Sequence, residues 1–86
     1  MDEHAQRFLL SLEPTHREHE TEIKKGHVAF SWWAPSCMLD VKVHSDGWVQ
    51  WESTIDGNQE TGLYKYKDSI PDSLHNLLQK VAIKIN

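Results

Sequence analysis

The chain has 86 residues, a formal net charge of −4 and one cysteine. This length allows one domain with a single core, near the lower limit for domains that fold without disulfides or metals. The acidic balance and the scattered lysines argue against duplex DNA or RNA, whose binding depends on clustered Lys and Arg. One cysteine forms no internal disulfide, and the chain shows neither a signal peptide nor an apolar run of membrane-spanning length. We therefore expect a soluble, cytoplasmic protein that binds no membrane.

The first expected element is a helix within residues 1–12. From position 3 onwards, apolar residues recur at helical spacing on one face: Ala5, Phe8, Leu9 and Leu12. Residues 13–26 then hold a single large apolar side chain, Ile23, among many charged ones. This segment is expected to be a solvated, charged helix or a linker, because little of it can be buried.

From His27 the apolar residues alternate with polar ones, which predicts strands. A turn at 34–37 and a three-residue loop at 45–47 place Val41 and its cross-strand neighbours on one face. The third turn is expected within 56–60, in a register that pairs Trp51 with Tyr66 and sets Glu52 beside Lys65. The sheet should then contain four strands, near 27–33, 38–44, 48–54 and 62–67.

The registers agree on one apolar inner face, which is the expected core. It carries Val28, Phe30, Trp32, Leu39, Val41, Val43, Val49, Trp51, Tyr64 and Tyr66. A second helix over residues 69–85, capped by Ser69, is expected to cover this face together with the first helix. The predicted fold class is α+β: a four-stranded antiparallel meander sheet with N- and C-terminal helices packed on one face, in a single domain over residues 1–86.

The outer face should be polar, yet it carries four large apolar side chains. The expected register brings Trp33, Met38 and Leu63 together at one corner, and Trp48 lies elsewhere on the face. Met and Trp on such a face are typical of surfaces that bind protein partners. We therefore expect a non-enzymatic protein-binding module that pairs with its own copy as a homodimer or with a foreign protein. The alternative is that residues 13–26 fold over these side chains.

Two groups of histidines suggest a different function, that of a small metal-dependent or acid–base enzyme. On a helix, His16, His19 and Glu20 would share one face at metal-ligand spacing. In the sheet, His27 and His44 would be cross-strand neighbours. Neither group has an assured third or fourth ligand, so we expect no bound metal and no cofactor.

The remaining patterns identify neither a catalytic residue nor a family. Asp40 and Glu52 should be cross-strand neighbours, but a surface ion network with Lys65 explains them as well as acid–base chemistry does. The aromatic strands leave a single-stranded nucleic-acid binder as a third function, although most of the aromatics should be core. The Trp-rich strand, the Asp-Gly hairpin and the Ile-Pro-Asp helix start resemble small bacterial proteins, so a bacterial or phage mobile-gene origin is expected.

Overall fold

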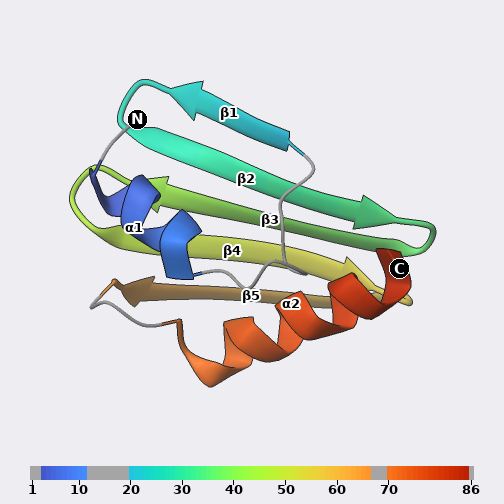
Figure 1. Cartoon of the computed structure of the whole chain (residues 1–86). Coiled ribbons are helices and arrows are strands. Elements are labelled where there is room, and N and C mark those ends of the chain that lie inside the picture. Colours follow the sequence, from blue (N-terminus) through green and yellow to red (C-terminus); the bar gives the residue numbers. More distant parts are fainter. Residues whose placement is uncertain (1–2, 12–19, 67–69, 86) are drawn as a thin grey trace.

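The computed structural model describes residues 3–11, 20–66 and 70–85, which form a five-stranded antiparallel sheet and two helices (Figure 1). The helices are α1 (Glu3–Ser11) and α2 (Asp72–Ile85). The strands are β1 (Glu20–Lys24), β2 (His27–Ala34), β3 (Cys37–His44), β4 (Trp48–Ile55) and β5 (Asn58–Lys65), and they lie side by side in chain order. The prediction of an α+β fold is confirmed, but among the described residues the sheet has five strands instead of four.

The additional strand, β1, lies in the segment that was expected to be a helix or a linker. It pairs antiparallel with β2, and Ile23 lies opposite Val28. The β-branched residues Thr21 and Ile23 alternate with charged ones, a pattern that suits an edge strand. The expectation of a helix or linker is therefore wrong for residues 20–24, because pairing with β2 orders a segment that buries little of itself. Residues 12–19 lie outside the described part of the chain.

The central three strands have the predicted registers. Val41 lies opposite Phe30 on one side and opposite Trp51 on the other, and all three are buried on the inner face. Val43 lies opposite Val49, as the three-residue loop requires. Gly47 in this loop donates its backbone N–H to the carbonyl of His44 at 3.0 Å.

The register of β5 differs from the prediction by four residues, because Trp51 lies opposite Gly62 and not opposite Tyr66. Asp56 and Gly57 alone form the turn, with φ values of 52° and 85°, which is the left-handed pair that a tight two-residue hairpin needs. The indole of Trp51 also occupies the space that a side chain at position 62 would need. Since the shift is an even number of residues, the inner and outer faces are preserved.

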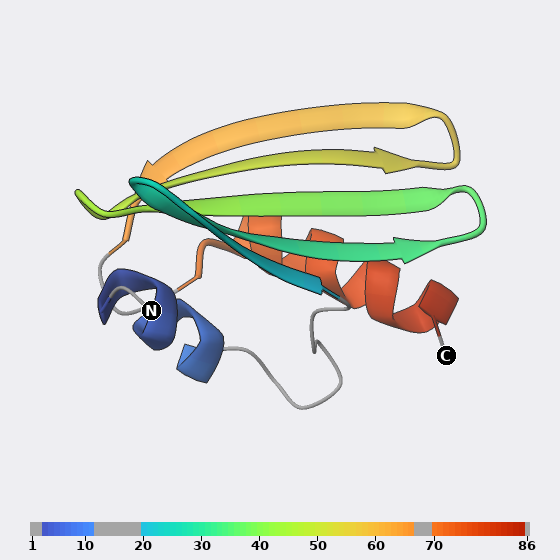
Figure 2. The same cartoon turned by 90° about the horizontal axis from the view of Figure 1, so that it is seen from above.

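Both helices cover the inner face, and Figure 2 shows them on the same side of the sheet. Phe8 of α1 stacks on Phe30 with ring centroids 5.5 Å apart. The Tyr66 hydroxyl donates to the Arg7 carbonyl at 3.1 Å, which ties α1 to the end of β5. From α2, the core receives Leu74, Leu77, Leu78 and Val81. The helix packs against β2, β3 and β4, which leaves the inner side of β5 mostly uncovered. The expected cap, Ser69, lies outside the described residues.

Candidate functional site

The first candidate surface is the outer face of the sheet, on which neither described helix lies. Trp33 of β2 lies opposite Met38 of β3, which in turn lies opposite Thr54 of β4. The exposed fractions are 47% for Trp33 and 36% for Met38. The two side chains flank the Pro35–Ser36 turn, so together they form an apolar patch at one end of this face, here called the Trp33–Met38 patch.

The other two predicted contact residues do not join this patch. Leu63 is 61% exposed and lies opposite Gln50 of β4. Gln50 is four residues from Thr54, the β4 residue opposite Met38, so the expected three-residue corner does not form. The reason is the four-residue shift of β5. Trp48 is 40% exposed and starts β4 at the other end of the sheet, where the Lys65 ammonium lies 5.5 Å from the centre of its ring.

Charged side chains occupy the middle of the outer face. Asp40 and Glu52 are cross-strand neighbours as predicted, and Asp40 accepts a hydrogen bond from the Ser31 hydroxyl at 2.7 Å. Lys65 was expected beside Glu52, but the register puts Thr61 there. The hollow beside the two carboxylates measures only about 60 Å³, well below the size of a usual small-molecule site.

The histidines form at most a pair in the described residues. His27 and His44 are cross-strand partners with ring centroids 5.4 Å apart, as predicted. Across the described ranges there is no group of three or more His, Cys, Asp or Glu side chains that could hold a metal ion. Glu20 lies in strand β1 and not on a helix, which removes the helical spacing on which its grouping with His16 and His19 depended. His16 and His19 themselves lie outside the described residues.

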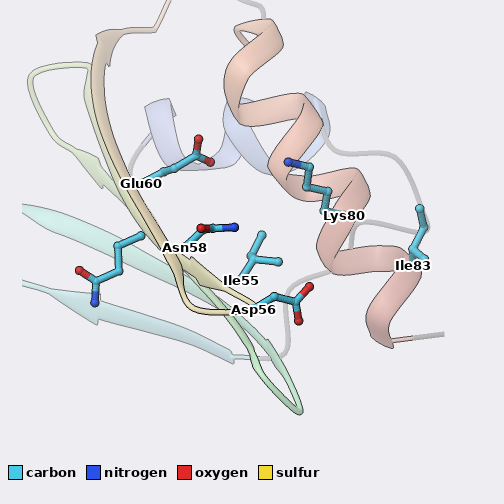
Figure 3. A pocket seen from close by; sticks show the side chains of 7 residues that line it. Ile55, Asp56, Asn58, Glu60, Lys80 and Ile83 are labelled. Carbon is cyan, nitrogen blue, oxygen red and sulfur yellow. The ribbon is translucent and has the colours of Figure 1, made fainter.

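The second candidate surface is a groove between β5 and α2, shown in Figure 3. Its wider end is a hollow of about 570 Å³ between the β4–β5 turn and the last turns of α2. The residues around it are Ile55, Asp56, Asn58, Gln59, Glu60, Lys80 and Ile83, all but Gln59 labelled in the figure. In the figure, Glu60 and Asn58 extend from β5 towards α2, and the Lys80 ammonium extends from α2 towards β5. Two isoleucines supply the apolar lining of the hollow: Ile55 lies between the β4–β5 turn and α2, and Ile83 lies on α2 on the side away from β5. Glu60 and Lys80 supply the charged part between the two walls.

A second hollow of about 220 Å³ continues the groove along β5. It shares Glu60 and Lys80 with the first hollow, and Trp51 and Leu77 contribute its apolar surface. On the α2 side, the groove residues recur at helical spacing and form one stripe: Ser73, Asn76, Leu77, Lys80 and Ile83.

Glu60 and Lys80, on opposite walls of the groove, are charged side chains without an ion-pair partner among the described residues. The sequence interpretation missed this groove because it depends on the register of β5 and on the position of α2. The available signals were the Asp56–Gly57 turn and Ile83, an apolar residue off the buried stripe of α2.

No family model, no curated protein and no solved structure matches the chain. Neither helix in the described ranges combines the length and the apolar character that crossing a bilayer requires. Similarity therefore shows no family, function or source organism for this chain, and what it does has to be inferred from the two surfaces described above.

Proposed function

We propose that this chain is a non-enzymatic protein-binding module that acts through the outer face of its sheet. The Trp33–Met38 patch is the observation that supports this function most directly. Both side chains are partly exposed on a face that no described helix covers. Tryptophan and methionine are enriched in protein interfaces, and tryptophan often contributes a large share of the binding energy.

A second copy of the chain is the partner that we expect. Two-fold pairing is the commonest assembly of small proteins, and it would place the Trp33–Met38 patch of one copy against the same face of the other. The central charged residues, including Asp40 and Glu52, would then lie at the polar rim that surrounds an interface core. Trp48 lies at the far end of the face beyond these charges, so it would contact the partner only at the edge of the interface.

Analytical ultracentrifugation at micromolar concentration tests the proposal. The wild-type chain is expected to sediment as a dimer, and Trp33→Glu as a monomer, because the substitution puts a charge into the apolar patch. The control is Gln50→Glu, which adds the same charge to an exposed site on the same face without removing an apolar side chain. This control should remain dimeric.

Two outcomes would contradict the proposal at different levels. A wild-type chain that is monomeric throughout the concentration range would exclude the second copy as partner. The accessibility of Trp33 then decides whether a partner surface exists at all, and fluorine NMR of 5-fluorotryptophan-labelled protein measures it. If Trp33 is shielded from solvent in the monomer, its own chain covers the patch and the protein-binding function is wrong.

A further inference from the structure

We propose that the groove between β5 and α2 binds an extended segment of another protein, which adds to the sheet as a further strand beside β5. This surface is separate from the outer face, so the inference does not depend on the proposed function. Strand addition of this kind draws its affinity from main-chain hydrogen bonds and its specificity from pockets for alternate side chains. The groove offers both.

The main-chain groups come from the free edge of β5. Ile55 and Asn58 flank a two-residue turn, so they form a hydrogen-bonded pair, and the pairs alternate along the hairpin from there. The even-numbered residues of β5 therefore bond to β4, and the Tyr66 N–H, which donates to the Gly47 carbonyl at 2.9 Å, continues the same alternation. Gln59, Thr61, Leu63 and Lys65 direct their N–H and C=O groups to the other side, where no described strand pairs with them.

The two edges of the sheet differ in how well they resist a new strand. β1 is short, and three of its five residues are charged, with a Lys24–Glu22 ion pair at 2.6 Å that lowers the pKa of Glu22. Short, charged edges discourage pairing. β5 has eight residues in an unbroken register with no bulge and no proline. Its inward-pointing charge, Glu60, faces Lys80 of α2 across the groove, so an incoming strand would meet both signs of charge there.

The dimensions of the groove suit a short extended segment. The stripe of α2 from Ser73 to Ile83 is about 15 Å long, and about five extended residues cover the same distance. Gln59 and Thr61 border the hollows although the strand alternation assigns their side chains to the outer face. We infer that their backbone is the part that lines the groove. A strand lying in the groove would thus have β5 on one side and α2 on the other.

The side chains of the groove define the chemistry of the occupant. Alternate residues of an added strand would point towards the floor, which is apolar at Ile55 and again at Trp51, while Ile83 borders the hollow from α2. Between these sites the segment passes Glu60 and Lys80, which form no ion pair with any described residue. An amide side chain complements both, because it donates to a carboxylate and accepts from an ammonium. We therefore assign the groove to an uncharged segment with an aliphatic residue at one inward position and Asn or Gln at the next.

A selection from random linear peptides provides the probe. The peptides have about ten residues, twice the length that the groove accommodates, and are selected against the immobilised full chain. The expected consensus is an aliphatic residue followed two positions later by Asn or Gln. A synthetic peptide of this consensus, labelled with fluorescein, then reports affinity by anisotropy.

Two matched pairs of variants test where the peptide binds. Thr61→Pro removes an N–H from the free edge of β5 without removing a hydrogen bond to β4, so it should weaken peptide affinity about tenfold. Its control, Thr61→Val, keeps this N–H and should change the affinity less than about twofold. Ile83→Asp places a charge at the α2 border of the larger hollow and should also weaken binding. Leu10→Asp makes the same kind of change at an exposed site on α1 and should leave binding unchanged. Circular dichroism checks that each variant is folded.

Hydrogen exchange on the wild-type chain gives a readout that needs no variant. In the free protein the amides of residues 59, 61, 63 and 65 should exchange faster than those of residues 60, 62 and 64, and the bound peptide should slow the faster set. Three results would overturn the proposal: no enriched peptide, a peptide whose affinity is the same for Thr61→Pro and Thr61→Val, or protection of the β5 edge in the free chain. Loss of dimerisation in Thr61→Pro would show that the edge pairs with a second copy and would equally exclude a foreign segment.

Discussion

At the scale of single residues, two glycines of the β4–β5 hairpin serve different physical purposes. Gly57 has a φ of 85° in the turn, and a Cβ atom there would meet no other atom within 4 Å. Gly62 has no positive φ, but a Cβ atom there would overlap the indole ring of Trp51. The first position therefore needs a residue that tolerates the left-handed region, and the second needs the absence of a side chain.

Asparagine separates these two requirements, because it tolerates the left-handed region but has a side chain. Gly57→Asn should change the free energy of unfolding by less than about 0.5 kcal/mol. Gly62→Asn should lower it by about 1–3 kcal/mol or more, because Trp51 must move. Urea denaturation measures both, and near-ultraviolet circular dichroism should change only for Gly62→Asn. Equal losses at the two positions would mean that the indole does not lie against Gly62.

At the scale of elements, strand β2 places two consecutive tryptophans in opposite environments. The side chain of Trp32 is 1% exposed, facing the helices, and that of Trp33 is 47% exposed on the other face. Because side chains alternate along a strand, this difference in exposure depends only on which face of the sheet the two helices cover. Substitutions at Trp32 and Trp33 therefore test whether the inner and outer faces of the sheet are assigned correctly.

Alanine substitutions at the two positions should give very different stabilities. Trp32→Ala should cost about 3–5 kcal/mol, which is most or all of the stability of a domain this small. Trp33→Ala should change the stability of the monomer by less than about 0.5 kcal/mol. Denaturant titration below the association range is the measurement. A large loss for Trp33→Ala in the monomer would show that part of the chain covers the outer face.

At the scale of the whole molecule, the response of stability to alkaline pH should depend on Tyr64. Its hydroxyl is buried and has no hydrogen-bond partner among the described residues. Burial raises the pKa of Tyr64 above its usual value, and the neighbouring Tyr66 raises this pKa further. An unfolded tyrosine ionises at about pH 10, whereas Tyr64 in the folded chain stays neutral at that pH. The stability is therefore intact below about pH 10 and is lost as the pH rises above it.

The substitution Tyr64→Phe should remove both effects of this hydroxyl. It should raise the free energy of unfolding at neutral pH by about 1 kcal/mol, because a buried group without a partner is removed. It should also reduce the loss of stability between about pH 9 and 11. The control is Tyr66→Phe, which removes the bond to the Arg7 carbonyl and should cost about 1 kcal/mol at neutral pH. If Tyr64→Phe is as destabilising as this control, the Tyr64 hydroxyl has a partner in solution.

The sequence by itself determined the features that depend on local periodicity and turn chemistry. Alternation along the central strands, together with the loop at Gly47, was enough to place Val41 and Trp51 on one buried face. Helical spacing predicted α1 and α2 in the same way. The Trp33–Met38 patch was also predictable, because its two residues flank a tight turn and must be neighbours in any register that this turn allows.

Only the tertiary structure decided the features that depend on contacts between distant segments. The register of β5 follows from the two-residue Asp56–Gly57 turn together with the fit of the Trp51 ring against Gly62, and it separates Leu63 from the patch. The turn residues are visible in the sequence, but the fit of the ring is a contact that no local pattern reveals. Strand β1 exists because β2 offers it an edge, not because it buries apolar residues of its own. The groove arises because α2 packs on β2, β3 and β4 and leaves most of the inner side of β5 uncovered. Its position is set by how one helix fits the whole inner face, which is a property of the assembled core and of no single segment.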